Sequence, residues 1–297
     1  MSTWSAIELR GVTKHYGDVE AVANLSLSIE EATSVAFLGP NGAGKSTLLN
    51  LIMGSAKLTQ GRISVLGHDP GSTAAKLRTG VMLQVTGVPE TLSVSEHIQL
   101  FRTYYVNSMQ FEKIIDIANL QGLEKRRYGS LSGGERQKLH FALALAGDPD
   151  LLYLDEPTSN MDVETRMSLW AQIQLFRKQN RTVVLNTHNL EEAELLADRI
   201  ILIDHGKIIA DAPPPSIRSL VGTTMVAATT SLSEEELSQL PGVLRTEFAD
   251  RQIRLFANSP EETVRAWLDL DPHLKNLEVK PAQLQDAYLH LVKGKSA

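Results

Sequence analysis

The sequence has no cysteine and no long apolar run, and each absence excludes a class of protein. Without cysteine, the chain of 297 residues cannot form disulfides, bind a metal through thiolates or use a thiol nucleophile. No apolar stretch reaches the roughly 18–20 residues that a membrane-spanning helix needs. Residues 1–18 lack the basic and apolar segments of a secretory signal. We therefore expect a soluble chain, compatible with a reducing cytosol, for which any membrane-spanning part would be another chain.

An excess of positive charge is also missing. The net charge is −6, so the chain has no overall positive field to attract nucleic acid. Its length is that of about two domains, and a hydrophobic fraction of 42% is sufficient for a full core.

Buried strands alternate with amphipathic helices over most of the chain, which predicts an α/β fold. We expect a helical insertion over about 85–150, with a capping box at Ser93 and a helix over 111–122 that ends at Gly122. Strands are expected at 7–17, 22–31, 35–38, 151–156 and 182–188, followed by a hairpin over 200–211 that turns at His205–Gly206. Further helices are expected over 46–53, 134–148, 162–179 and 189–199.

The prolines at 213–215 predict a linker over 213–221. Beyond residue 222 the alternation becomes shorter and predicts a small α+β module of the order βαββαβα. Ser259 followed by Pro260 is a typical helix start. This part of the chain carries no chemical motif.

The segment GPNGAGKS matches the pattern G-x-x-x-x-G-K-[ST] in full, between an expected strand and an expected helix. Glycines let successive N–H groups face one point, and the following helix adds its positive end, so the segment can hold phosphates. The alternative is a glycine-rich turn without a ligand, but chance would produce the pattern only about once in a hundred such chains. The candidate phosphate-binding residues are Gly39, Pro40, Asn41, Gly42, Ala43, Gly44, Lys45, Ser46 and Thr47.

Polar residues follow two other apolar strands. Asp155 can hold Mg²⁺ at the end of the strand 151–156, and Glu156 can act as a general base toward water. Alone, this acidic pair could instead cap a helix, but the P-loop upstream favours the catalytic interpretation. His188 should emerge at the same sheet edge, although a single histidine is more often a solvated loop residue. Considered alone, Gln84 and Tyr16 are ambiguous in the same way, because each could have a structural role rather than a role in a site.

The segment LSGGERQ, at 131–137, places a serine and two glycines just before a helix. This combination can hold an anion, yet it has no lysine and no metal ligand. It predicts a second anion site, incomplete by itself, formed by Ser132, Gly133 and Gly134, and leaves open which anion it holds.

The motifs together resemble the ATPase domain of ABC transporters over residues 5–212, because their order and spacing agree and LSGGERQ matches the family's signature sequence. The resemblance implies a P-loop NTPase core with an antiparallel β subdomain and a helical insertion, followed here by an accessory α+β domain at 222–297. It implies hydrolysis of ATP with Mg²⁺, and two ATPase domains that pair head to tail around two ATP molecules.

The resemblance also implies roles for individual residues. Tyr16 would stack on adenine, Lys45 would contact the phosphates, and Ser46, Gln84 and Asp155 would hold Mg²⁺. Glu156 would be the catalytic base, and Gln84 and His188 would contact the water or the γ-phosphate. Asp162 would lie at the dimer interface beside the nucleotide.

The tail over 274–294 is similar to the end of ATPases from bacterial systems that export drugs, antibiotics and polysaccharides. This resemblance implies a dimer, homomeric or with a paired ATPase, attached through separate permease subunits to the cytoplasmic face of the inner membrane. The alternatives are an importer ATPase and an ABC ATPase that acts on nucleic acid or ribosomes. The second is disfavoured by the acidic net charge, the single cassette and the interval of fewer than a hundred residues before LSGGERQ.

Overall fold

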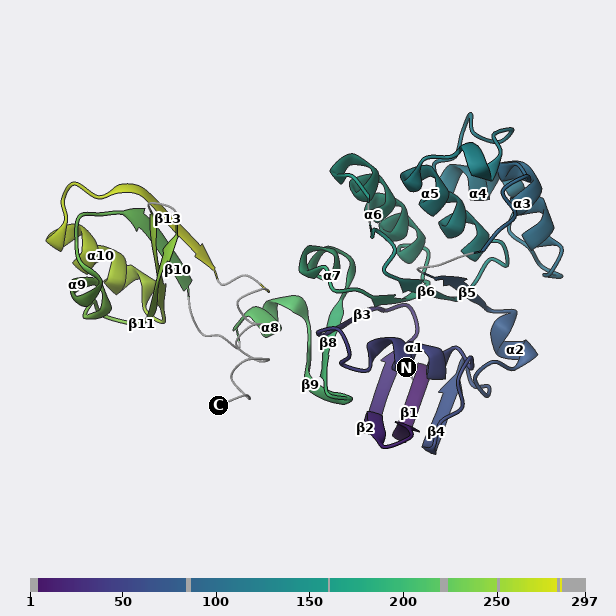
Figure 1. Cartoon of the computed structure of the whole chain (residues 1–297), viewed down its shortest axis with the longest axis horizontal. Helices are drawn as coiled ribbons and strands as arrows, with labels where there is room; N and C mark the ends of the chain where they lie inside the picture. Colours follow the sequence, from purple (N-terminus) through teal and green to yellow (C-terminus); the bar gives the residue numbers. More distant parts are fainter. Residues whose placement is uncertain are drawn as a thin grey trace. The chain divides into compact units, whose positions relative to one another are not determined.

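The computed structural model describes residues 5–83, 87–159, 161–219, 224–249, 252–281 and 284. The chain divides into two compact units, Met1–Ala212 and Pro213–Ala297 (Figure 1). The first unit is built on two sheets and the second on one.

The central sheet of the first unit has the strand order β5-β6-β7-β3-β8-β9. Neighbours from β5 to β8 are parallel, and β9 runs antiparallel to β8. Every residue of β3 and β7 is buried, which explains why these strands read as continuous apolar runs. The bounds are β3 (Ser34–Leu38), β5 (Thr79–Met82), β6 (Leu151–Asp155), β7 (Thr182–Asn186), β8 (Arg199–Asp204) and β9 (Lys207–Ala212).

The parallel register brings three strand ends together at one edge. Asp155 at the end of β6 is in register with Asn186 at the end of β7, and Asn186 is in register with Phe37 of β3. The loops that follow these strands therefore emerge side by side, which is where open α/β sheets bind their ligands.

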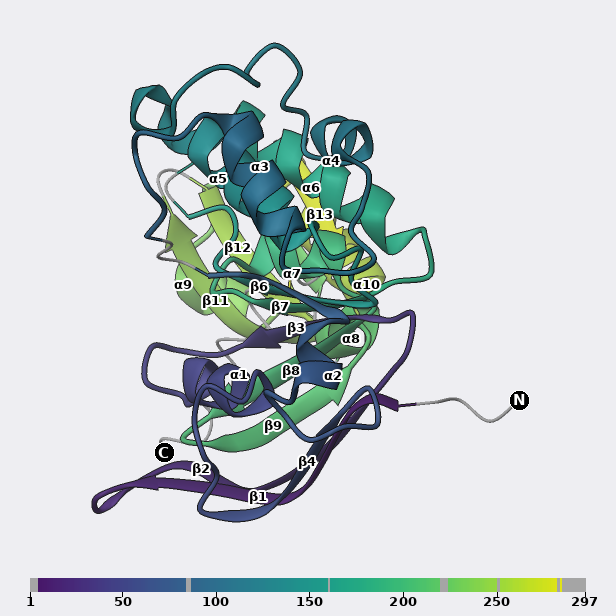
Figure 2. The ribbon, with the colours of Figure 1, turned by 90° about the vertical axis from the view of Figure 1, so that its right-hand side faces the viewer.

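A three-stranded antiparallel sheet, of order β2-β1-β4, lies on the other side of α1 from the central sheet (Figure 2). One apolar core joins it to α1 and to one face of the central sheet, with Ile7, Leu48 and Phe37 each almost completely buried. The bounds are β1 (Ser5–Tyr16), β2 (Val19–Glu30), β4 (Gln60–Val65) and α1 (Lys45–Ile52).

The other helices of the first unit follow the expected order, so the α/β fold and its helical insertion are confirmed. The insertion falls between β5 and β6, and the expected capping box at Ser93 is present. Figure 2 shows α3 to α6 on the face of the central sheet that is opposite α1. The bounds are α2 (Thr73–Lys76), α3 (Val94–Arg102), α4 (Phe111–Ile117), the 3-10 helix η1 (Tyr128–Ser130), α5 (Gly133–Ala144), α6 (Val163–Arg177) and α7 (Leu190–Leu196).

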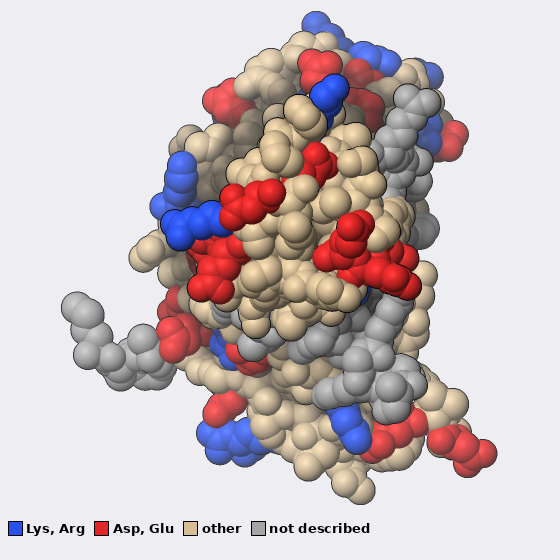
Figure 3. Space-filling view, turned by 90° about the vertical axis from the view of Figure 1, so that its left-hand side faces the viewer, with Lys and Arg blue, Asp and Glu red and all other residues tan. Residues whose placement is uncertain are grey.

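The second unit has an antiparallel sheet of order β11-β12-β10-β13. Its core packs Trp267 of α10, which is fully buried, against Val226 and Leu255 of the sheet. Figure 3, which looks onto this unit, shows groups of acidic side chains on it, and α9 begins with the acids Glu234–Glu236. The bounds are α8 (Pro214–Ser219), β10 (Thr224–Thr229), α9 (Glu234–Ser238), β11 (Val243–Ala249), β12 (Gln252–Ala257), α10 (Pro260–Leu270) and β13 (Lys275–Pro281).

Several local predictions differ from the structure, and the helices expected to end at 148 and 199 end at Ala144 and Leu196. The expected linker contains a helix, α8, because Pro214 and Pro215 occupy the first turn, where proline costs no hydrogen bond. The helix from residue 111 ends at Ile117 rather than at Gly122, because Asn119 takes the left-handed conformation just after it. Helix α10 starts at Pro260 as expected, but the side chain of Ser259 does not cap it. The last helix expected of the module lies beyond the described residues, as does Gln84.

Candidate active site

The phosphate-binding segment GPNGAGKS, called the P-loop below, leads from β3 into α1, and its last glycine, Gly44, is the N-cap of that helix. Gly44 has φ 100°, and no side chain caps the helix start. The first N–H groups of α1 therefore have no side-chain acceptor within the loop, which is the arrangement that binds phosphate. The bond from Ala43 N to Pro40 O, at 3.2 Å, closes the loop upstream.

Close backbone approach explains why glycine stands at position 44. A Cβ atom there would lie 2.3 Å from the carbonyl oxygen of Ala21 and 3.4 Å from Cα of Gly206. The φ of 100° is also a conformation that other residues rarely adopt. The loop is thus pressed against the start of β2 and against the β8–β9 turn, which fix its shape.

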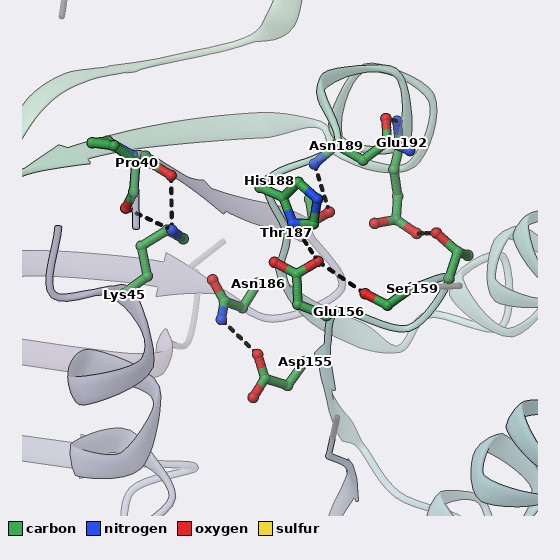
Figure 4. Close-up of polar contacts among 12 residues, drawn as sticks. Pro40, Lys45, Asp155, Glu156, Ser159, Asn186, Thr187, His188, Asn189 and Glu192 are labelled. Atoms are coloured by element: carbon green, nitrogen blue, oxygen red, sulfur yellow. Dashed lines mark hydrogen bonds and ion pairs between the residues drawn. The ribbon is translucent and has the colours of Figure 1, made fainter. Parts of the chain in front are cut away.

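Lys45, the first residue of α1, is 7% exposed and points back across the loop. Its Nζ donates to Gly39 O at 2.7 Å and to Pro40 O at 3.1 Å (Figure 4). Burial lowers the pKa of Lys45, and the nearby carboxylates of Glu156 and Asp155 oppose this effect. The ammonium group is thereby held at the mouth of the phosphate loop.

Asp155 is bound by the neighbouring strand. Nδ2 of Asn186 donates to Oδ1 of Asp155 at 2.6 Å. Burial raises the pKa of Asp155, while this hydrogen bond acts in the opposite direction. In the described part of the chain, Oδ1 of Asn186 is buried without a hydrogen-bond partner. An unpaired acceptor beside a carboxylate suits a site that holds water or a hydrated cation.

Glu156 has φ 51°, an uncommon conformation for a residue with a side chain. Its N–H donates to Asn186 O at 2.8 Å, which holds it at the sheet edge. Oε2 of Glu156 lies 2.7 Å from Nδ1 of His188 and accepts a bond of 3.3 Å from the Ser159 hydroxyl (Figure 4). The side chain of Glu156 is only 15% exposed, whereas that of His188 is 68% exposed. A carboxylate and an imidazole in contact at a cavity can position a water molecule and accept its proton.

These groups line one cavity of about 550 Å³. Asn41 to Thr47 form its floor, and Asp155, Glu156 and His188 lie on its wall. Sequence reasoning missed the remaining lining residues, which are Val19, Glu20, Ala21, Asn186, His205 and Gly206. Only the expected His205–Gly206 turn gave a signal, and it did not reveal that Gly206 N donates to Ala43 O of the P-loop at 2.9 Å.

Tyr16 lies at the end of β1, beside the cavity rather than among its lining residues. Its ring is half exposed, and it pairs across the turn with Val19, which does line the cavity. Nζ of Lys14 lies 4.6 Å from the centre of the ring, so a cation occupies one face of it.

The LSGGERQ segment lies outside this cavity, on the helical insertion. Ser132 is the N-cap of α5, and a complete capping box joins it to Glu135. The structure brings this segment against the start of α6: a Cβ atom on Gly134 would lie 2.5 Å from Cγ2 of Thr165. Thr165 donates from its N–H and its hydroxyl to Asp162, at 2.9 and 2.8 Å. Ser132, Gly134 and Asp162 thus belong to one packed corner.

Similarity to known proteins covers almost the whole chain. A family model described as ABC transporter matches residues 22–159. The Nod factor export ATP-binding protein I of Rhizobium sp. (strain N33) is 33% identical, and that of Burkholderia orbicola is 34% identical. Each alignment covers 96% of this chain and 96% of the relative.

Solved structures agree with the fold of the first unit. A dimeric ATP-binding cassette in a post-hydrolysis state, bound to ADP and Pi, is 26% identical with a TM-score of 0.62. The match covers 70% of this chain and 98% of that one. A second structure, the ATP binding subunit of an ABC transporter, has a TM-score of 0.67 at 22% identity, covers 73% of this chain and 94% of that one, and shows the fold alone.

Proposed function

Because the chain belongs to the family of ABC transporter ATP-binding proteins, we propose that it is the subunit that binds and hydrolyses ATP to power export through separate permease chains. The observation that carries the proposal is the meeting of the P-loop, Asp155, Glu156 and His188 in one cavity. The relatives are named for the export of Nod factors, and they match this chain over both of its units.

The P-loop is proposed to hold the phosphates of ATP. The uncapped start of α1 supplies N–H donors, and Lys45 supplies a positive charge to the β- and γ-phosphates. Tyr16 is proposed to offer its exposed ring to the adenine. The partner of that ring would be a flat base, since the opposite face already has the ammonium group of Lys14.

The hydroxyl of Ser46, the carboxylate of Asp155 and the side chain of Gln84 are the residues that would hold Mg²⁺. The unpaired Oδ1 of Asn186 supports a hydrated cation at this place. When bound, Mg²⁺ neutralises charge on the phosphates as the γ-phosphate is transferred.

Glu156 is proposed to accept the proton of the attacking water. Its carboxylate is nearly buried at the cavity wall and is oriented by His188 and Ser159. His188, whose side chain is more exposed, is proposed to contact the γ-phosphate once nucleotide fills the cavity. Gln84 would contact the same water or the metal.

The corner of Ser132, Gly133, Gly134 and Asp162 is proposed to complete the site of a second subunit. Cassettes of known structure in this family form dimers. In such a pair this corner would face the γ-phosphate held by the partner's P-loop. The partner is a second copy or a paired ATPase.

The attachment of the protein is proposed from its family. The described residues contain no helix that is long and apolar enough to cross a membrane. We propose that permease subunits hold the protein at the cytoplasmic face of the inner membrane. Residues 5–212 would be the ATPase domain, 213–221 the connection and 222–297 the accessory domain. The acids Glu234–Glu236 at the start of α9 and the net charge of −6 disfavour nucleic acid as a partner.

The Glu156→Gln variant tests this function. It should bind ATP with about wild-type affinity, lose at least roughly 100-fold in turnover and accumulate as a dimer with ATP. The measurements are steady-state phosphate release, nucleotide binding and size-exclusion chromatography with light scattering. Hydrolysis at the wild-type rate would show that Glu156 is not the base.

A further inference from the structure

One buried carboxylate near the site has no role in the account above. Glu192 lies in α7 and is 1% exposed, while its neighbour Glu191 is largely exposed. Burying a carboxylate costs stability unless donors surround it. Around the Glu192 carboxylate the donors come from two segments outside α7, the turn after β6 and helix α6.

The hydrogen bonds of Glu192 reach both sides of the site. Its Oε1 accepts from the hydroxyl of Thr158 at 2.7 Å and from the indole N–H of Trp170 at 3.0 Å. On the other side of the site, the backbone N–H of Glu192 donates to Oδ1 of Asn189 at 3.2 Å. Thr158 stands two residues after Glu156, and Asn189 stands directly after His188. Glu192 therefore ties the turn that carries Glu156 to the loop that carries His188, through its carboxylate on one side and its N–H on the other.

The turn at Glu156 needs such support. Glu156 has φ 51°, and a residue with a side chain keeps this conformation only where its surroundings hold it. Within the turn, Ser159 N donates to Glu156 O at 3.2 Å. Thr158, in the middle of that turn, is 7% exposed and is fixed by Glu192. On the other side, Thr187 is fully buried and also accepts from Asn189 N at 3.0 Å.

We propose that Glu192 is a positioning residue, which by binding Thr158 from the helix that follows His188 sets the separation and orientation of Glu156 and His188 for the attack of water. The proposal rests on the function proposed above, in which these two residues orient that water. It requires hydrogen bonds to Glu192 and not its negative charge. Burial raises the pKa of Glu192, while the surrounding hydrogen-bond donors act in the opposite direction.

Four variants of the full chain test the proposal. Glu192→Ala and Thr158→Val should each lower kcat by roughly 10- to 100-fold, because a displacement of about 1 Å at reacting groups can cost on the order of 100-fold. The dissociation constant for ATP should stay within about threefold of wild type, since the P-loop is untouched. Glu192→Gln keeps an acceptor oxygen for Thr158 and Trp170 and should recover most of the rate. Glu191→Ala, the adjacent control, should change kcat by less than about twofold.

The readout separates positioning from a loss of folded protein. Rates are divided by the number of ATP sites measured by titration, so an unfolded fraction cannot lower kcat. Glu192→Ala should also add almost nothing to Glu156→Gln in single-turnover hydrolysis, because it acts through Glu156. Three results would overturn the proposal. The first is an unchanged kcat per site in Glu192→Ala, and the second is a loss of ATP affinity in that variant as large as its loss of kcat. The third is a Glu192→Gln variant as slow as Glu192→Ala.

Failure of this inference can be told from failure of the proposed function. If Glu156→Gln is inactive but Glu192→Ala turns over normally, only the role of Glu192 is wrong. If Glu156→Gln hydrolyses ATP at the wild-type rate, the proposed base is wrong, whatever Glu192→Ala does.

Discussion

Two helices of the first unit begin after segments rich in glycine and serine, yet their first turns differ. Helix α1 starts at Gly44 with no side chain capping it. Helix α5 starts at Ser132, whose hydroxyl accepts from Glu135 N at 3.3 Å while Oε2 of Glu135 accepts from Ser132 N at 2.7 Å. The first turn is thus open in α1 and closed by a capping box in α5.

The difference indicates how much of a phosphate site each helix can supply. The open turn of α1 needs an external anion, and Lys45 stands beside it with a positive charge. In α5 the capping box already uses two donors, which leaves the Ser132 hydroxyl proton and the N–H groups of Gly133 and Gly134 outside it. We infer that α1 can hold phosphate by itself, whereas α5 needs a nucleotide presented by another subunit.

The largest expected effect comes from adding a methyl group at Gly44, and the same change at Gly133 of the α5 segment serves as its comparison. Gly44→Ala would place Cβ 2.3 Å from Ala21 O in a left-handed conformation, so the loop must move. We expect ATP affinity to fall by on the order of 100-fold, about 3 kcal/mol. At Gly133 a Cβ atom meets nothing within 4 Å, so Gly133→Ala should leave the free energy of unfolding within ~0.5 kcal/mol. ATP affinity is measured by titration with a fluorescent ATP analogue, and stability by thermal unfolding. An equal loss of ATP affinity in Gly44→Ala and Gly133→Ala would contradict the comparison.

The second expected effect separates the two sites in one assay. Ser132→Arg should leave ATP affinity of the single subunit within about threefold of wild type, because Ser132 does not line the cavity. It should lower ATPase turnover by roughly 100-fold, since a large side chain would occupy the place of the partner's phosphate. Introduced into Glu156→Gln, it should prevent the ATP-dependent dimer seen by light scattering. A dimer that persists with normal turnover would exclude the composite site.

The smallest expected effect concerns the capping box. Glu135→Ala should destabilise the protein by about 1 kcal/mol, and Glu135→Gln, which keeps an acceptor, by less. The pKa of Glu135 lies below its ordinary value, chiefly because it accepts from Ser132 N. Its ionised form therefore contributes stability that is complete above the ordinary value of 4.5 and is lost as the pH falls through the lowered pKa. Urea unfolding at pH 7 and pH 3 should show a deficit for Glu135→Ala that shrinks at the lower pH.

The sequence could predict features whose causes are local. The P-loop, the Asp155–Glu156 pair and the capping box at Ser93 each depend on residues a few positions apart. The contacts of Ala21 and Gly206 with the P-loop could not be predicted, because they depend on how β2 and the β8–β9 turn dock on it. These are tertiary contacts between segments far apart in the chain.

In helix α7, too, the sequence could not predict which of two neighbouring residues makes tertiary contacts. Its first turn has two acids, Glu191 and Glu192, which the sequence explains equally well as favourable charges at a helix start. In the structure one is exposed and the other is almost completely buried between Thr158 and Trp170. Only the packing of α6 and of the turn after β6 against α7 distinguishes the two.

The hydrogen bonds of Lys45 to Gly39 and Pro40 have a consequence for the thermodynamics of nucleotide binding. Lys45 already orders the loop, because its Nζ is bonded to Gly39 O and Pro40 O. A phosphate would therefore replace existing hydrogen bonds of Lys45 and would not have to order a flexible segment. The backbone entropy of ordering, about 1–2 kcal/mol per residue, is lost during folding rather than at binding. Binding of ATP to a single subunit should therefore show only a small heat-capacity change, since the P-loop buries little new apolar surface.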